Sequence, residues 1–166
     1  MKKLLLLMAV GWAVLALSAA GPARAAGDWS WPVVGPVIRG FDPPDTPFGS
    51  GHRGIDIAAS VGTPVRAAEA GIVTFAGPVG GRLFLTIDHG AGLESRYSFL
   101  SALAARRGDV ISMGQVIARS GTGHVGDLVP NLHFGVLLDD MYVDPLEYLG
   151  PLEVWRFIRL APLAAG

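Results

Sequence analysis

The sequence contains no cysteine, and charged residues make up only 16% of its 166 positions. Without cysteine the chain forms no disulfide, so its stability must come from packing, from a bound metal, or from both. Lysine is also scarce, since it occurs only at positions 2 and 3. Because binding to nucleic acid depends on clustered Lys and Arg side chains, we expect no nucleic-acid partner.

The one long apolar run of the sequence stands at its N-terminus. Lys2 and Lys3 precede the run, which extends from Leu4 to Leu17, and small residues follow up to Ala25. This order predicts a secretory signal peptide over residues 1–25, cleaved after Ala25. The run is shorter than the about 20 residues that span a bilayer. An uncleaved anchor is the alternative, and the absence of cysteine excludes a lipid-anchored lipoprotein.

Cleavage after Ala25 would leave 141 residues, enough for one domain with a hydrophobic core. Ten arginines would then stand against 14 acidic residues, a net charge of −4. We expect an extracytoplasmic protein of the cell envelope, or a secreted one, with a single domain over residues 26–150 and no membrane span after signal cleavage. Residues 151–166 form an apolar C-terminal tail.

Glycine and proline divide the rest of the sequence into short apolar runs. These runs are rich in β-branched and aromatic residues, and turn signals such as Gly-Gly and His-Gly separate them. We expect strands at Thr63–Ala67, Gly71–Ala76, Leu83–His89, Leu93–Leu100, Gln115–Ser120 and Leu132–Leu138. The pattern predicts an all-β fold, an antiparallel sandwich or barrel-like sheet with little helix.

Two segments have the composition of short helices. Ser101–Arg107 would form one or two turns, and Pro151–Leu160 would form a C-terminal helix with proline in its first turn. No repeat with a period of 20 to 50 residues is evident, so solenoids and propellers are excluded.

Only four histidines are available for metal binding or proton transfer. His52 and Asp56 lie four residues apart, and Asp56 stands between two isoleucines. A strand period of two would turn Asp56 away from the core, and the same period puts His133 on the face opposite Leu132 and Phe134. From the residues alone, a metal site and ordinary hydrogen-bonded surface residues both remain open.

Several short motifs in one order resemble the lysostaphin/LytM-type zinc endopeptidases. Residues 51–59 read GHRGIDIAA, followed by GTPVRA at 62–67, GIV at 71–73, IDHG at 87–90, RY at 96–97, GDV at 108–110, GQVI at 114–117 and LHF at 132–134. The resemblance covers about residues 31–149. It implies the antiparallel β architecture called the duplicated hybrid motif, one zinc ion per chain, and the peptides of bacterial peptidoglycan as substrate.

The same resemblance implies the metal ligands His52, Asp56 and His133, which are the residues singled out by the strand period. Two other positions depart from the family pattern. Phe99 stands where the family has the histidine of Tyr-x-His-Leu, and Asn131 stands for the first histidine of His-x-His. A general base contributes about 10²- to 10⁴-fold to a rate, so their loss matters.

Three residues are candidates for the remaining roles. His124 lies in a glycine-rich loop before the His133 strand and could replace the general base, with Asp127 orienting its imidazole; a solvent-exposed loop histidine is the alternative. Asn131 could donate a hydrogen bond to an oxyanion but cannot accept a proton. Tyr97 could line a substrate groove or be buried in a strand.

Two functions follow from this sequence. The first is an exported zinc metalloendopeptidase that cuts peptide bonds of peptidoglycan, which the complete ligand set favours. The second is a catalytically degenerate domain that binds wall peptide or regulates another wall hydrolase, which the two missing histidines favour. A purely structural zinc site is weaker, because such sites have four protein ligands and are usually rich in cysteine.

Overall fold

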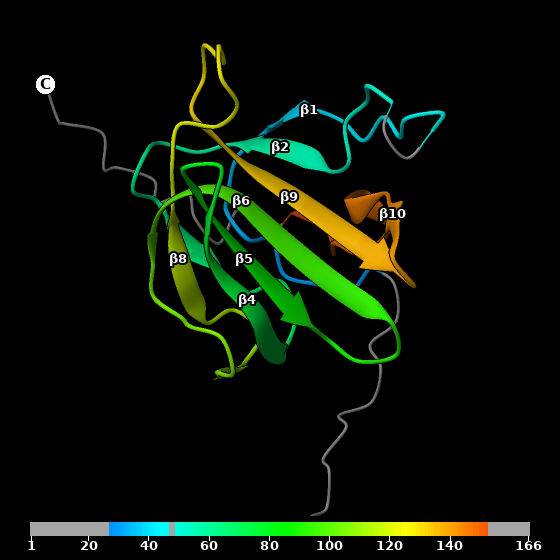
Figure 1. Cartoon of the computed structure of the whole chain (residues 1–166), viewed down its shortest axis with the longest axis vertical. Helices are drawn as coiled ribbons and strands as arrows, with labels where there is room; N and C mark the ends of the chain where they lie inside the picture. The colour runs from blue at the N-terminus through cyan, green and yellow to red at the C-terminus, as the bar shows by residue number, and fades with distance from the viewer. Residues whose placement is uncertain (1–26, 47–48, 153–166) are drawn as a thin grey trace, which may run out of the picture.

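The computed structural model describes residues 27–46 and 49–152, and these residues form one antiparallel sheet with ten strands (Figure 1). The strands are β1 Val37–Arg39, β2 Ile55–Ala58, β3 Pro64–Arg66, β4 Gly71–Val79, β5 Arg82–Asp88, β6 Leu93–Leu103, β7 Val110–Ile111, β8 Val116–Ser120, β9 Asn131–Leu138 and β10 Met141–Val143. One 3₁₀ turn, η1 Pro145–Glu147, follows β10.

The strand order is β1-β2-β9-β6-β5-β4-β7, with β10 against β9 and β8 bridging β3 and β6. The predicted all-β antiparallel fold is confirmed. The sheet stays open instead of closing into a barrel, because β1 and β7 at the two ends of this path do not pair with each other. No helix in the described part of the chain is long and apolar enough to cross a membrane.

All six strands expected from the sequence are present. The helix expected at Ser101–Arg107 is wrong, because β6 continues to Leu103 and its backbone pairs with β8. The Ala104 and Ala105 amides then both donate to the Ile117 carbonyl. Tertiary pairing therefore overrides the local helix preference. The predicted signal peptide lies outside the described residues, as does the expected C-terminal helix from residue 153 onward.

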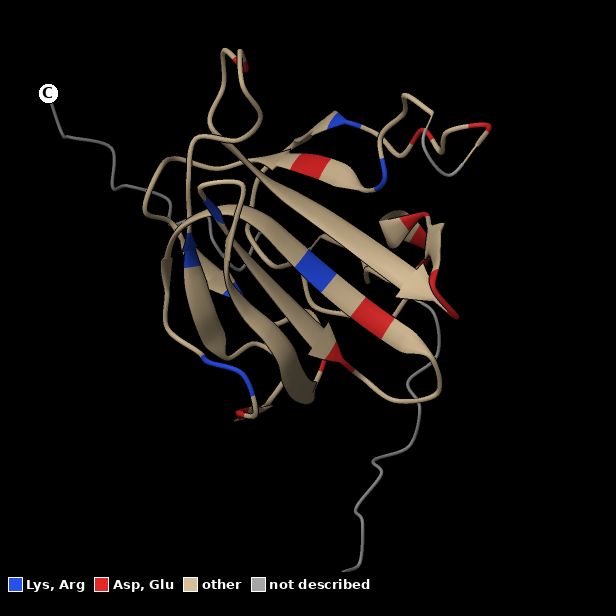
Figure 2. Ribbon diagram, in the orientation of Figure 1, with Lys and Arg blue, Asp and Glu red and all other residues tan. Residues whose placement is uncertain are grey.

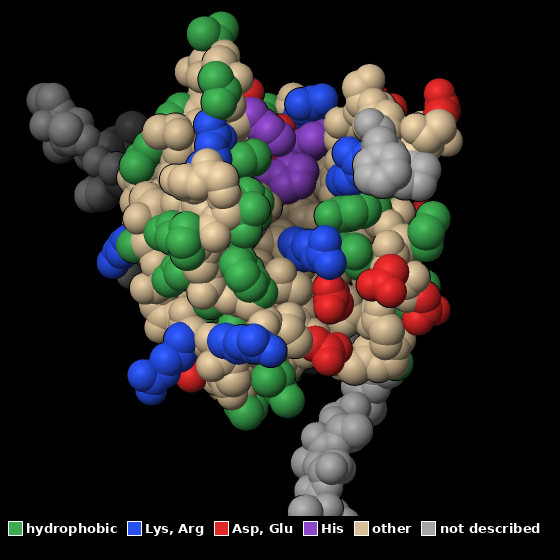
Figure 3. Space-filling view, viewed as in Figure 1, with side chains coloured by type: hydrophobic (Ala, Val, Ile, Leu, Met, Phe, Trp, Pro, Cys, Tyr) green, Lys and Arg blue, Asp and Glu red, His purple; other side chains and the backbone are tan. Residues whose placement is uncertain are grey.

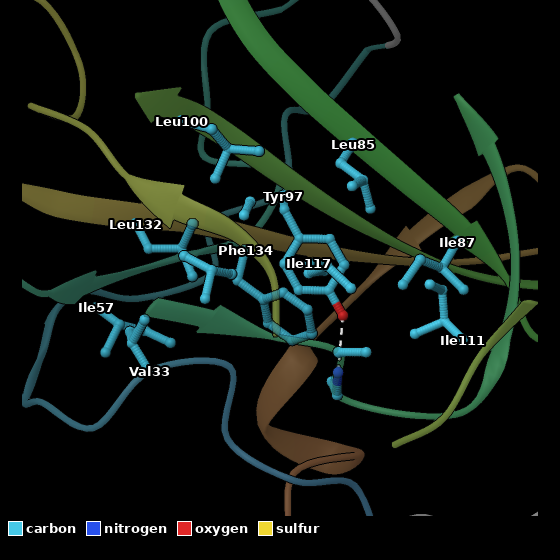
Figure 4. Packing of buried hydrophobic residues seen from close by; sticks show 14 of the residues in the cluster. Val33, Ile57, Leu85, Ile87, Tyr97, Leu100, Ile111, Ile117, Leu132 and Phe134 are labelled. Carbon is cyan, nitrogen blue, oxygen red and sulfur yellow. Dashed lines mark hydrogen bonds between the residues drawn. The ribbon is translucent and has the colours of Figure 1, made fainter. Parts of the chain in front are cut away.

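The hydrophobic core lies against one face of the central strands (Figure 4). The apolar side chains of β2, β5, β6 and β9 meet there, and Tyr97 and Phe134 are its two largest fully buried side chains. Their rings lie 5.3 Å apart, in a tilted arrangement. Since a core of this kind holds β2, β6 and β9 in fixed register, it also fixes the side chains on the opposite face of these strands.

Tyr97 is fully buried, so of its two expected roles the structure shows burial rather than contact with substrate. Its hydroxyl accepts a hydrogen bond from the Ala68 amide at 2.8 Å and another from Ser95 Oγ at 3.1 Å. Ser95 Oγ in turn lies 2.8 Å from His89 Nε2, while His89 Nδ1 lies 2.7 Å from the Ala70 carbonyl. This chain of hydrogen bonds ties β6 to the segment between β3 and β4.

The charged residues of the sheet are scattered. In Figure 2 the basic positions lie on separate strands and loops, and β6 carries charges of both signs. On β6 the Arg96 guanidinium pairs with Glu94 at 3.1 Å and donates to the Tyr142 hydroxyl at 3.0 Å. On β6 charges of both signs therefore stand side by side.

Burial raises the pKa of Tyr97 to about 12, which predicts a loss of stability at high pH. Above pH 10 the unfolded chain releases the phenol proton while the folded chain retains it, so unfolding becomes easier by about 1.4 kcal/mol per pH unit until pH about 12. Urea unfolding between pH 9 and 12 measures this slope. Tyr97→Phe should remove this contribution, and the control Tyr148→Phe, whose ring is partly exposed, should keep it.

Candidate metal centre

The register of two neighbouring strands brings an acid and a histidine together. In the antiparallel pairing of β2 with β9, Asp56 lies directly opposite His133. Side chains at opposed positions project from the same face of a sheet. Ile55 and Ile57 flank Asp56 and are fully buried in the core on the other face. The alternation expected from the sequence therefore places Asp56 as predicted, because its two apolar neighbours occupy the core.

His52 reaches the same place from the segment before β2. Its backbone forms a bridge with Asp42, and its ring is buried. His52 Nδ1 lies 2.6 Å from the Gly40 carbonyl oxygen. Because a carbonyl only accepts hydrogen bonds, Nδ1 donates, and in the neutral ring the lone pair then belongs to Nε2. A backbone group thus aims a metal-binding nitrogen into the site, as outer-shell partners of metal-binding histidines do.

The imidazoles of His52 and His133 both approach one oxygen atom of the Asp56 carboxylate. Asp56 Oδ1 lies 3.0 Å from His52 Nε2 and 2.9 Å from His133 Nδ1, and the two nitrogens lie 3.0 Å apart. With His124 included, four ligand atoms lie within 4.8 Å of one another. In Figure 3 the histidine side chains gather in a hollow of the molecular surface.

The protonation of the site suits a cation. Burial alone would raise the pKa of Asp56, but hydrogen bonds and charge interactions with His133 and His52 outweigh it, and the pKa lies well below its ordinary value. Burial lowers the pKa of His133, and the hydrogen bond and charge interaction with Asp56 only partly offset this lowering. The low pKa of Asp56 favours the ionised carboxylate and the lowered pKa of His133 favours the neutral imidazole, which are the forms that bind metals.

A divalent cation fits these residues. His52 Nε2 lies 3.0 Å from Asp56 Oδ1, where a proton on the imidazole would join the two atoms, and a cation between them would take the place of that proton. His124 Nε2 is buried and has no hydrogen-bond partner, which leaves a further lone pair or N–H at the same place. Imidazole and carboxylate ligands without sulfur match zinc in particular.

The carboxylate of Asp127 holds the loop that carries His124. Asp127 Oδ2 accepts hydrogen bonds from the His124 backbone amide and from Asn131 Nδ2, both at 2.7 Å. Asp127 therefore orients the backbone of His124, whereas the sequence led us to expect contact with its imidazole. The ring itself turns to the metal centre, where His124 Nε2 lies 3.3 Å from Asp56 Oδ1.

Asn131 is fully buried under this loop. Its amide group donates to Asp127 and, at 3.0 Å, to the Val129 carbonyl. A Cβ atom at Gly123 would collide with the same amide, so the loop packs directly on Asn131. Both amide hydrogens are committed to the loop, and this geometry argues against the expected role of Asn131 as an oxyanion donor.

Phe99 lies beside the histidines. Its ring is 4.4 Å from the ring of His124, edge to face, and 6.0 Å from that of His133. The backbone of Phe99 is left-handed, with φ of 60°, at an irregularity in the pairing of β6 with β5, between the part of β6 that pairs with β9 and the part that pairs with β8. Such a conformation is rare for a bulky residue and is found where the surrounding structure imposes it.

Arg82 supports the loop that carries His124, a role that the sequence did not predict. Its guanidinium carbon lies 4.8 Å from the centroid of the Phe99 ring, and its NH1 donates to the Gly123 carbonyl at 2.8 Å. The side chain thus joins the start of β5 to the His124 loop. Arg82 lies 42 positions before His124 in a sequence with scattered charges, so no local pattern pointed to it.

Substitution of the central carboxylate tests the site. At a free zinc concentration 100-fold above Kd, the wild-type protein should gain about 2.7 kcal/mol of unfolding free energy. Asp56→Asn should lose most of this gain, because a neutral amide is a poor ligand for zinc. Asp140→Asn, which changes an exposed acid elsewhere, is the matched control and should keep it. Thermal unfolding with and without zinc measures the gain, and equal gains in both variants would contradict the site.

Comparison with known proteins gives relatives over most of the chain. The uncharacterised protein Rv2891 of Mycobacterium tuberculosis is 36% identical over 162 residues, which cover 92% of this chain and 63% of that protein. DD-carboxypeptidase/endopeptidase Mpg of Neisseria meningitidis is 39% identical over 102 residues, 60% of this chain and 23% of that protein. The chain thus spans less than two thirds of the length of these curated relatives.

Solved structures share the fold. A zinc-containing peptidase from Vibrio cholerae matches with a TM-score of 0.59 and 29% identity, over 77% of this chain and 41% of that one. The catalytic domain of the antimicrobial peptidase lysostaphin from Staphylococcus simulans matches with a TM-score of 0.55 and 27% identity, over 64% and 86%. Residues 50–145, which include all four residues of the metal centre, match Peptidase family M23, and the chain belongs to that family.

Proposed function

We propose that the protein is an exported zinc metalloendopeptidase that hydrolyses peptide bonds of bacterial peptidoglycan. One observation carries the proposal, the convergence of His52 Nε2, His133 Nδ1 and Asp56 Oδ1 within 3.0 Å of one another. Membership of Peptidase family M23 supports the reaction class. The similarity to Mpg, a DD-carboxypeptidase/endopeptidase, supports a peptide substrate, and the N-terminal sequence supports export.

His52, Asp56 and His133 would hold the zinc ion. When bound, zinc supplies a Lewis acid that polarises a carbonyl and lowers the pKa of a water molecule to about 7. Asp56 would contribute the negative charge that makes the site selective for a cation over a neutral ligand. The hydrogen bond from His52 Nδ1 to the Gly40 carbonyl would hold the ring in place and leave Nε2 to bind the zinc ion.

His124 would accept and return the proton during hydrolysis. Among the described residues it is the remaining imidazole that faces the three ligands, with its ring 5.2 Å from that of His133 and 5.7 Å from that of His52. An imidazole suits proton transfer near neutral pH. Phe99 offers no proton acceptor at the position where the family pattern has histidine, so the task would pass to this loop.

The peptide would lie in the hollow beside Phe99. A cavity of about 400 Å³ lies there, lined on one side by the start of β5 and on the other by Gly121–Gly123, the residues just before His124. Phe99 and Leu83 give it apolar walls, and Arg82 gives it a positive charge that could meet a carboxylate of the wall peptide.

A catalytically degenerate domain that binds wall peptide, or that regulates another wall hydrolase, is the second candidate. The structure gives it one specific support: Phe99 contributes no proton acceptor and Asn131 no free donor, so neither replaces a catalytic histidine. A domain of this kind would keep the groove and lose the chemistry.

Digestion of purified cell walls separates these candidates. We expect the zinc-loaded protein to release free peptide amino groups and a chelator to abolish the release. His133→Ala and Asp56→Asn should lower the rate about 1,000-fold or more, since a catalytic metal contributes several kcal/mol. Asp140→Asn should digest walls at the wild-type rate. Chelator-independent release would contradict the metallopeptidase, and stable binding to walls without any release would favour the degenerate domain.

A further inference from the structure

We propose that His124 is a fourth protein ligand of the metal, so that the conformation described above is a closed state of the site. The inference rests on the proposed zinc site and adds one imidazole to its three ligands. It differs from the role of a general base, because a base acts on a water molecule and stands farther from the ion.

The distance from His124 Nε2 to Asp56 Oδ1 is that between two ligands of one zinc ion. In a tetrahedral zinc site with bonds of 2.0–2.1 Å, neighbouring ligand atoms lie about 3.3 Å apart. His124 Nε2 lies 3.3 Å from Asp56 Oδ1, beside edges of 2.9 and 3.0 Å from Asp56 to the other two histidines. His124 Nε2 and Asp56 Oδ1 therefore have the spacing of two ligands of one zinc ion, and the four ligand atoms all lie within 4.8 Å of one another.

The state of the His124 nitrogen points the same way. The ring is 30% exposed, yet Nε2 itself is buried and makes no hydrogen bond. Desolvating an imidazole nitrogen without a hydrogen-bond partner costs free energy. A metal ion at the centre of the cluster would remove that cost.

Contacts at the base of the loop hold the imidazole in this place. Asp127 accepts the His124 amide, Arg82 donates to the Gly123 carbonyl, and the edge of Phe99 meets the His124 ring. The outer part of the loop lacks such support, since Val125 is 88% exposed and Leu128 is 99% exposed. The contacts that hold the imidazole are therefore few, and the exposed side chains of the loop add no packing to them.

A four-ligand site has a functional consequence. Structural zinc sites have four protein ligands, whereas catalytic sites keep one position open. With His124 bound the site is closed, and a peptide can reach it only after the loop withdraws. Withdrawal would also free the same imidazole to accept a proton, so ligand and base would be two positions of one side chain.

X-ray absorption of the zinc-loaded full chain counts the imidazole ligands directly. We expect three imidazoles in the wild-type protein and two in His124→Ala. Val125→Ala, which alters an exposed neighbour on the same loop, is the matched control and should keep three. Two imidazoles in the wild-type protein would overturn the proposal, and this outcome needs no variant to fold.

Zinc affinity gives a second readout. Because loss of an outer-shell partner already weakens metal binding about 10- to 100-fold, loss of a ligand should weaken it about 100-fold or more. Competition with a chromophoric chelator measures Kd for the wild-type protein, His124→Ala and Val125→Ala. A Kd for His124→Ala within about threefold of the wild-type value would contradict the proposal. Added free imidazole should restore the third imidazole signal in His124→Ala.

Neither measurement uses a substrate, so the two proposals can fail separately. Three imidazoles together with no release of wall peptides would refute the peptidase and leave the fourth ligand in place. Two imidazoles in a protein that digests walls would refute the fourth ligand alone.

Discussion

The structure depends on one oxygen atom, Asp56 Oδ1, on which three imidazoles converge. Two of them lie at hydrogen-bond distance and the third at 3.3 Å. A carboxylate buried to this degree is unfavourable unless opposite charge or hydrogen bonds compensate for its lost hydration. The neighbouring histidines supply part of this compensation, and a cation would supply the rest. The fold therefore holds the ionised carboxylate of Asp56 out of contact with water and surrounds it with imidazoles.

Distant parts of the chain must be in register for this arrangement to exist. His52 and Asp56 come from the entry to β2, His133 from β9 and His124 from the loop between β8 and β9. A shift of one residue between β2 and β9 would turn Asp56 toward the core and Ile57 toward the metal centre. The apolar side chains of the opposite face prevent such a shift, so the packing around Tyr97 and Phe134 specifies the geometry of the polar site.

The sequence predicted the features that depend on local pattern. Period-two alternation located β9 and the orientation of Asp56, and motif order identified the family. Features that depend on pairing between distant segments escaped it. Ser101–Arg107 has a helical composition, yet β8 provides partners for its first residues, which extends β6. The support of His124 by Arg82, and the capture of both Asn131 hydrogens, arise only once the loop folds back on β9.

The left-handed backbone of Phe99 separates the shape of the site from its chemistry. Phe99 lies at an irregularity in the pairing of β6 with β5, between the part of β6 that pairs with β9 and the part that pairs with β8, although an aromatic side chain is poorly suited to positive φ. Histidine tolerates positive φ better than most residues do. The backbone at residue 99 is therefore one that histidine would adopt more readily than phenylalanine, so that Phe99→His would place an imidazole beside His124 without a change in the pairing of the strands.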